Sequence, residues 1–139
     1  YVLRNDLGLT GTRHGCTTGY CGACKIMIDG RPIAACSVQV EAIAGRKVET
    51  IEAIENSETG RLLLDAVLDI QAGQCGYCLP GMLMEARVIL RRHPDYSRDE
   101  IAAALDGHIC RCGSHNRIID AIVQASETLN AGTTKGEPA

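Results

Sequence analysis

The chain has 139 residues, of which 45% are hydrophobic, and its formal net charge is -3 at pH 7. This balance is neither basic nor acidic enough to indicate nucleic acid, a membrane surface or a disordered tail as the main partner. The longest apolar run, "RLLLDAVLDIQA", is interrupted by charge well before the roughly 20 residues that a membrane span requires, and nothing resembles a secretory signal. The length suits one or two small domains. Because such domains bury little area, a covalent cross-link or a bound metal would add to their stability.

The first half of the chain predicts strands and turns. The runs "KIMI" (25–28) and "RPIAACSV" (31–38) flank Asp29-Gly30, a pair favoured in a two-residue hairpin turn because both central positions need positive φ. A third strand is expected in "KVETIE" (47–52). Pro32 then lies near a strand start or at a sheet edge, where its missing N–H does no harm.

From about residue 57 the apolar residues recur at helical spacing, and we expect four helices. The first covers about 62–70 and ends at Gly73, the second runs from Pro80 to His93, the third follows a capping box at 97–100, and the fourth covers about 118–129. The predicted organisation is therefore a β-rich module (1–55), a four-helix module (56–130) and a flexible tail (131–139).

All eight cysteines fall into two groups of four, one in each module. Disulfides are one reading of such crowding. However, the cysteine content is lower than in typical disulfide scaffolds, and C-x-C and C-x2-C neighbours are awkward partners for distant bridges. Metal ligation is therefore favoured.

The first group is Cys16, Cys21, Cys24 and Cys36, and its spacing is C-x4-C-x2-C-x11-C. The first three positions have the spacing of the plant-type [2Fe-2S] loop. Gly15, Gly19 and Gly22 would let the chain turn repeatedly around a cluster. Zinc is the alternative, but zinc motifs usually combine two separate C-x2-4-C pairs, whereas here three ligands share one glycine-rich loop.

The second group is Cys75, Cys78, Cys110 and Cys112. Cys78 and Cys112 each precede a predicted helix, whose N-terminus should lower the thiol pKa and stabilise a negative cluster. Spacing alone leaves zinc and iron-sulfur nearly even at this site. His108 and His115 flank "CRC" and could ligate zinc, but four cysteines already complete a site. We therefore expect both histidines to face solvent or to be hydrogen-bonded.

The runs "LGLTGTRHGCTTGYCGACKIMIDG", "QCGYCLPGM" and "ICRCGSHNRI" closely resemble the small iron-sulfur subunit, or N-terminal iron-sulfur region, of the molybdenum hydroxylases related to xanthine dehydrogenase, aldehyde oxidoreductase and isoquinoline 1-oxidoreductase. The resemblance covers the chain to about residue 126 and includes all eight cysteines in order. It implies an α+β fold, with a β-grasp ferredoxin-like domain and a four-helix domain that each carry a [2Fe-2S] cluster. Family members begin with two further strands, so the N-terminal hairpin is expected to be missing and the sheet to expose an edge.

The resemblance also implies a function. The cluster of the helical domain would lie nearest the molybdopterin cofactor of a separate large subunit, with Gln74 and Cys112 approaching the pterin; the plainer reading of Gln74 is a surface amide. The chain would then be the electron-transfer subunit of a multi-subunit molybdenum oxidoreductase, and would carry no catalytic residue for the organic substrate. The electron acceptor would be the FAD of a flavin subunit or the haem of a cytochrome. Neither nucleic acid binding nor membrane insertion is expected, and the location would be cytoplasmic, or periplasmic if the complex is exported.

Many relatives have "CRCTGY" where this chain has "CRCGSH", a form that resembles small subunits of enzymes acting on N-heterocycles or aldehydes. Arg111, between two cysteines, could offset cluster charge or face solvent. Two other functions remain as alternatives. A stand-alone ferredoxin would leave the helical module unexplained, and a zinc-stabilised interaction module would have no redox role.

Overall fold

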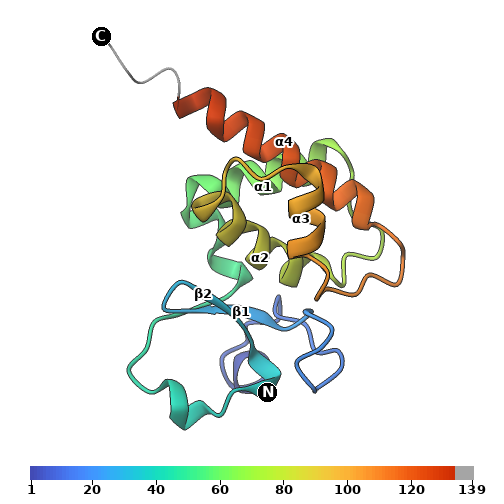
Figure 1. Ribbon diagram of the computed structural model, residues 1–139. Coiled ribbons are helices and arrows are strands. Elements are labelled where there is room, and N and C mark those ends of the chain that lie inside the picture. Colours follow the sequence, from blue (N-terminus) through green and yellow to red (C-terminus); the bar gives the residue numbers. More distant parts are fainter. Residues whose placement is uncertain (134–139) are drawn as a thin grey trace.

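A small sheet and a group of four helices lie against each other in the computed structural model, which describes residues 1–133 (Figure 1). The strands are β1 (Lys25–Ile28), β2 (Arg31–Ala34) and β3 (Val48–Glu49). The helices are α1 (Glu58–Asp69), α2 (Leu79–Arg92), α3 (Arg98–Ala104) and α4 (His115–Thr133). Single turns of helix occur at Val2–Asp6, Ala35–Ser37, Val40–Ile43 and Ile51–Asn56. The predicted α+β fold is confirmed. Below, the sheet module means the elements up to Asn56, and the helical module means α1 to α4.

The sheet is antiparallel throughout, in the order β2-β1-β3. The predicted hairpin turn is confirmed, because Asp29 (φ 49°) and Gly30 (φ 75°) both have positive φ. Pro32 lies in β2, an edge strand, as expected. The third strand is only two residues long, because the chain enters the helical turn Ile51–Asn56 directly after Thr50.

The helix starts follow the local sequence signals. Ser57 caps α1 by accepting the Gly60 N–H at 3.2 Å, and the predicted capping box between Ser97 and Glu100 opens α3. The first helix ends earlier than Gly73, at Asp69, because Gln71 takes the left-handed conformation (φ 51°) and Ala72 N–H bonds back to the Val67 carbonyl. At the other end of the module, α4 runs to Thr133, and residues 134–139 of the expected tail lie outside the described part of the chain.

The main core belongs to the helical module, and a smaller core joins it to the sheet. Fully buried side chains of the main core include Leu63, Met82, Leu90, Ile118 and Ile122. The smaller core is formed by Met27 of β1 with Met84 and Val88 of α2. Within residues 1–133, no helix is long and apolar enough to cross a membrane.

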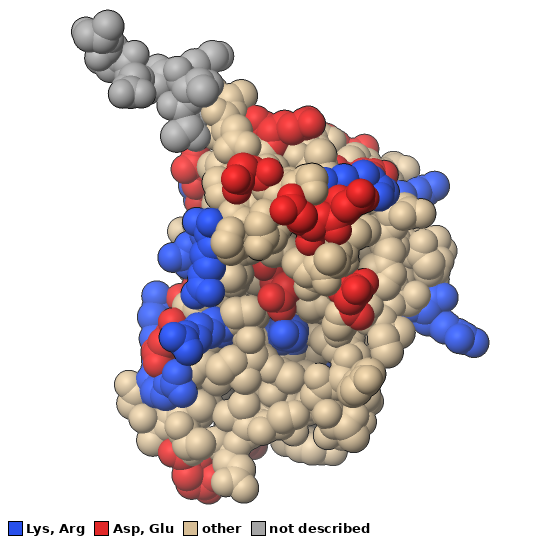
Figure 2. All heavy atoms as spheres, viewed as in Figure 1, with Lys and Arg blue, Asp and Glu red and all other residues tan. Residues whose placement is uncertain are grey.

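Charged side chains line the seam between α2 and the sheet. Arg87 of α2, only 7% exposed, donates to Glu49 of β3 at 2.9 Å, and Lys25 of β1 pairs with Glu85 of α2 at 3.0 Å. Figure 2 shows Lys and Arg side chains gathered where the hairpin meets the end of α2, and Arg92 there donates to the Gly30 carbonyl. Polar pairing therefore fixes how α2 lies on the sheet.

Glu49 should contribute to stability in a pH-dependent way. The Lys47 ammonium beside it, and then the Arg87 guanidinium, hold its pKa below the ordinary value. Glu49→Gln should lower the free energy of unfolding at neutral pH by about 1–3 kcal/mol, because Arg87 loses its charged partner while it stays buried. Urea unfolding of both proteins over a pH series measures this difference.

The difference should be fully present above about pH 4.3, the ordinary glutamate pKa, and disappear as the pH falls through the lowered folded-state value. A difference that persists unchanged in strong acid would contradict the ion-pair assignment. Asp29→Asn is the control, since the Asp29–Arg46 pair is exposed and its loss should change stability little.

Candidate metal centres

The first cysteine group is held by a tightly bent loop. Cys16, Cys21 and Cys24 lie on this loop, and Cys36 lies in the helical turn that follows β2. Gly19 (φ 76°) and Gly22 (φ 73°) take the left-handed conformation, as their predicted role in turning the chain requires. Gly15 serves a different purpose, since a Cβ there would lie only 2.5 Å from the Cys21 sulfur.

The loop points backbone N–H groups at its own sulfur atoms. Tyr20 and Cys21 donate to the Cys16 sulfur at 3.1 and 3.3 Å, and Gly19 donates to the Cys36 sulfur at 3.2 Å. Hydrogen bonds from Thr18 and from the amide of Cys21 lower the pKa of the Cys16 thiol to about 5. Such donors stabilise thiolates and are what an anionic thiolate-ligated cluster requires.

Cys24 differs from the other three because it is buried, with 5% of its surface exposed. Burial raises the pKa of its thiol, and the neighbouring Cys36 thiol contributes to the shift. The backbone reinforces this contact, since Ala35 N–H donates to the Cys24 carbonyl at 3.1 Å. Cys24 and Cys36 are therefore neighbouring thiols whose segments the main chain holds together.

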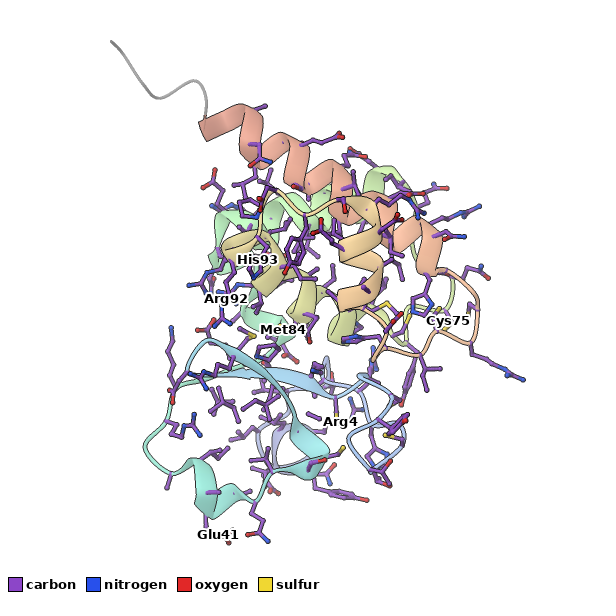
Figure 3. The ribbon with its side chains drawn as sticks, viewed as in Figure 1. Arg4, Glu41, Cys75, Met84, Arg92 and His93 are labelled. Carbon is purple, nitrogen blue, oxygen red and sulfur yellow. The ribbon has the colours of Figure 1, made fainter. Side chains whose placement is uncertain are left out.

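The second cysteine group lines a single hollow at the surface of the helical module. Cys75 and Cys78 lead into α2, and Cys110 and Cys112 lie between α3 and α4. The remaining lining residues are Gly73, Gln74, Gly76, Leu79, Ser114 and Ile118. Figure 3 shows Cys75 on the side of the helical module that is nearest the cysteine loop of the sheet module.

The thiols of the second group also lie in pairs. Cys75 lies beside Cys112, and Cys78 beside Cys110, while Ser114 N–H donates to the Cys110 sulfur at 3.4 Å. Within residues 1–133, no three His, Cys, Asp or Glu side chains converge as a single metal ion would require. Four thiols in two pairs, with amide donors, instead fit a binuclear cluster in which each iron takes two thiolates.

The expected lowering of thiol pKa is wrong for Cys78 and Cys112. Cys78 does lie at the N-cap of α2, but burial and the neighbouring Cys110 thiol raise the pKa of Cys78 to about 12. Desolvation outweighs the helix N-terminus here. For Cys112, a backbone hydrogen bond with Cys75 lowers the pKa, but the Cys75 thiol and burial together raise it further. Metal binding deprotonates a coordinating thiol outright, so these two thiols need the metal to become thiolates.

The partner thiol Cys75 shows the opposite shift. Its side chain is exposed and receives the Tyr77 N–H, and this hydrogen bond lowers its pKa. The second group therefore contains one thiol, Cys75, whose pKa is lowered at the open side of the hollow, and one, Cys78, whose pKa is raised by burial.

The other residues singled out in the sequence have distinct positions. Gln74 is exposed and its side-chain amide donates to the Cys112 carbonyl at 3.1 Å. Arg111 is exposed. The expectation for His108 is wrong, because it is 4% exposed and neither ring nitrogen has a hydrogen-bond partner within the described residues. His115 is half-buried, and its Nε2 has no partner in that part of the chain.

The two cysteine loops meet directly. Ile109 N–H donates to the Cys21 carbonyl at 3.1 Å, and the Tyr77 hydroxyl donates to the His14 carbonyl. The guanidinium of Arg13 lies 5.8 Å from the Tyr77 ring centroid. These contacts bring the metal-binding parts of both modules together.

Gly81, in the first turn of α2, makes this approach possible and was missed by sequence reasoning. A Cβ at Gly81 would clash with the carbonyl of Gly22. The sequence did contain an indication of its role. Gly81 lies inside a predicted helix, directly after Pro80, and a glycine there lowers helix stability, so another requirement has to explain it.

Comparisons with known proteins agree with this geometry. Residues 10–74 match the family model described as a 2Fe-2S iron-sulfur cluster binding domain, and residues 50–123 match the one described as a [2Fe-2S] binding domain. A nicotinate dehydrogenase subunit from Pseudomonas putida is 41% identical over 91% of this chain and 81% of its own length. The alpha subunit of isoquinoline 1-oxidoreductase from Brevundimonas diminuta is 38% identical over 91% of this chain and 83% of its own length.

Solved structures show the same similarity. A chain of quinoline 2-oxidoreductase from Pseudomonas putida 86 has a TM-score of 0.86 and 41% identity, and the match covers 94% of this chain and 82% of that one. Aldehyde oxidoreductase from Desulfovibrio gigas has a TM-score of 0.85 and 34% identity, but the match covers only 15% of that longer chain.

Gly81→Ala should destabilise the protein, although alanine is the better helix former by up to about 1 kcal/mol. The added methyl group would push the start of α2 away from Gly22, and we expect a lower melting temperature together with weaker retention of metal at the first cysteine group. Thermal unfolding and metal analysis measure the two effects. Gly132→Ala in α4 is the control, because a Cβ there meets no atom of residues 1–133 within 4 Å. Equal stability of Gly81→Ala and the wild type would contradict the close approach.

Proposed function

This chain belongs to the small iron-sulfur subunits of the molybdenum hydroxylases, and from that premise we propose that it relays electrons from a large molybdopterin-binding subunit to a flavin subunit or a cytochrome. Its role in electron transfer within an oxidoreductase is common to that family. The identity of the two neighbours in the relay is the part proposed here.

The observation that carries the proposal is the hydrogen bond from Ile109 N–H to the Cys21 carbonyl. Cys21 belongs to the first thiol group, and Ile109 directly precedes Cys110 of the second. One hydrogen bond and a short stretch of backbone therefore connect the two groups. Each site, when loaded, supplies one-electron chemistry through its [2Fe-2S] cluster. A relay needs two such sites in close contact, whereas a structural metal module does not.

We assign all eight thiols as ligands, two neighbouring thiols to each iron. Cys24 and Cys36 would hold one iron of the first cluster, and Cys16 and Cys21 the other. In the second cluster, Cys75 would act with Cys112, and Cys78 with Cys110. The domain boundary near residue 55 agrees with this division, since residues 1–55 and 56–130 would each carry one complete set.

The exposed parts of the two sites define where the neighbours would bind. Gln74 and Cys75 are exposed, and Gln74 holds the loop of Cys112, so this side of the second site suits the pterin of the large subunit. Tyr20, 76% exposed on the first loop, offers an apolar contact for the acceptor. The named relatives act on nicotinate, isoquinoline and quinoline. We therefore propose N-heteroaromatic compounds as the substrates of the complex that contains this chain, and aldehydes as the second candidate class.

The location of the complex is proposed on separate grounds. All eight cysteines are free thiols, which suits the reducing cytoplasm; a complex that is loaded there and then exported to the periplasm is the alternative.

Metal analysis with EPR spectroscopy tests the ligand assignment. The reduced protein should contain about four iron and four sulfide per chain and give two distinct signals. Cys78→Ser should remove one signal and about half of the iron, and Cys21→Ser should remove the other signal. Each variant controls for the other. Zinc in place of iron, or loss of both signals in each variant, would overturn the proposed pair of independent sites.

Gln74→Ala tests the face assigned to the large subunit. Because the Gln74 amide donates to the Cys112 carbonyl and not to a thiol, both EPR signals of the isolated chain should remain. In the complex, reduction of the clusters by substrate should become several-fold slower, since the loop next to the pterin loses its support. Rapid-mixing spectroscopy measures the rate. An unchanged reduction rate would show that Gln74 has no part in the proposed electron path. The control is Gln124→Ala on α4, because the Gln124 side chain donates to Asp69, away from the second cysteine group.

A further inference from the structure

His108 is a buried polar side chain that the relay itself does not explain. It lies between α3 and Cys110, with 4% of its surface exposed. Its ring is packed against the first cysteine loop so closely that a Cβ on Gly22 would clash with it. Neither ring nitrogen has a hydrogen-bond partner within the described residues. The ring therefore fills the space between the two loops by its shape.

A charged pair lies beside this ring. Glu85 of α2 places its carboxylate 4.0 Å from His108 Nε2, and the same carboxylate pairs with Lys25 at 3.0 Å. Lys25 directly follows Cys24, and His108 lies two residues before Cys110. The series Lys25, Glu85 and His108 thus runs from a thiol of the first group to a thiol of the second.

The backbone around His108 leaves little freedom for either loop. Gly22 has φ 73°, and Gly107 places its carbonyl 3.0 Å from where a Gly22 Cβ would lie. The next residue after His108 makes the hydrogen bond from Ile109 to Cys21. Removal of the ring would leave a void directly beside that hydrogen bond, and surrounding segments relax only partly into such voids.

We propose that His108 is a positioning residue, whose buried ring, packed against Gly22 and beside Glu85, fixes the separation and relative orientation of the two cysteine loops. The inference rests on the proposed function only in taking each loop to carry a cluster. It adds that the coupling between the two clusters depends on a side chain that ligates neither of them. The role is steric and orientational, and His108 itself takes no part in electron or proton transfer.

The test compares His108→Ala with His108→Gln and Val88→Ala in the loaded protein. Glutamine keeps a similar length and fills part of the same space. Val88, 9% exposed, belongs to the small core with Met27 and Met84, so its truncation weakens the same seam away from the thiols. Iron and sulfide contents are measured first in every variant.

The first readout is the magnetic interaction between the two reduced clusters, seen as splitting or faster spin relaxation in EPR spectra. Dipolar interaction falls steeply with distance, so His108→Ala should weaken it while both clusters remain at full content. His108→Gln should restore most of it, and Val88→Ala should leave it at the wild-type value although the protein unfolds more easily.

The second readout does not depend on the clusters. Hydrogen exchange of the segment 107–110 should become about tenfold faster or more in His108→Ala, because the Ile109 hydrogen bond opens more often. The proposal would be overturned if His108→Ala kept both the magnetic interaction and the hydrogen-exchange rate of the wild type. It would also be overturned if Val88→Ala weakened the magnetic interaction as much as His108→Ala does. Failure of the proposed function looks different, because the wild type itself would then lack iron or one of the two signals.

Discussion

Close backbone contact between Gly22 and Gly81 is the constraint on which the rest of the structure depends. Gly22 lies inside the first cysteine loop, Gly81 lies in the first turn of α2, and no side chain fits between them. Cys78, at the start of the same helix, is thereby brought toward the thiols of the sheet module. The two cysteine groups belong to different modules. They become neighbours because the two glycines have no side chains that would keep their backbones apart.

The seam around this contact is polar. A polar seam defines the position of α2 on the sheet more than it strengthens the association of the two modules. Arg87 with Glu49 and Lys25 with Glu85 are largely buried, while the apolar contribution comes from the small core of Met27, Met84 and Val88. Buried ion pairs add little net stability, because desolvation offsets their attraction. A shifted arrangement, however, would leave each of these charges buried without its partner. The seam therefore disfavours wrong registers of α2 on the sheet more than it stabilises the right one.

Features that depend on neighbours in the sequence were predictable, and features that depend on long-range packing were not. The Asp29-Gly30 turn, the Ser97 capping box and the two cysteine groups follow from local spacing, and the structure has the first two as expected and brings each cysteine group together. The buried position of His108 depends on Gly22, which is far away in the sequence. The raised pKa of Cys78 likewise comes from burial, which the helix start alone does not reveal.

The burial of Cys24 also bears on how the mature protein is made. Three thiols of the first group are partly open to solvent, but Cys24 is buried, and α2 lies against the two residues before it, Gly22 and Ala23. A cluster is therefore most easily inserted while the loop is still open, before α2 docks on Gly22 and Ala23. Docking of the two modules then limits access to this thiol in the finished protein.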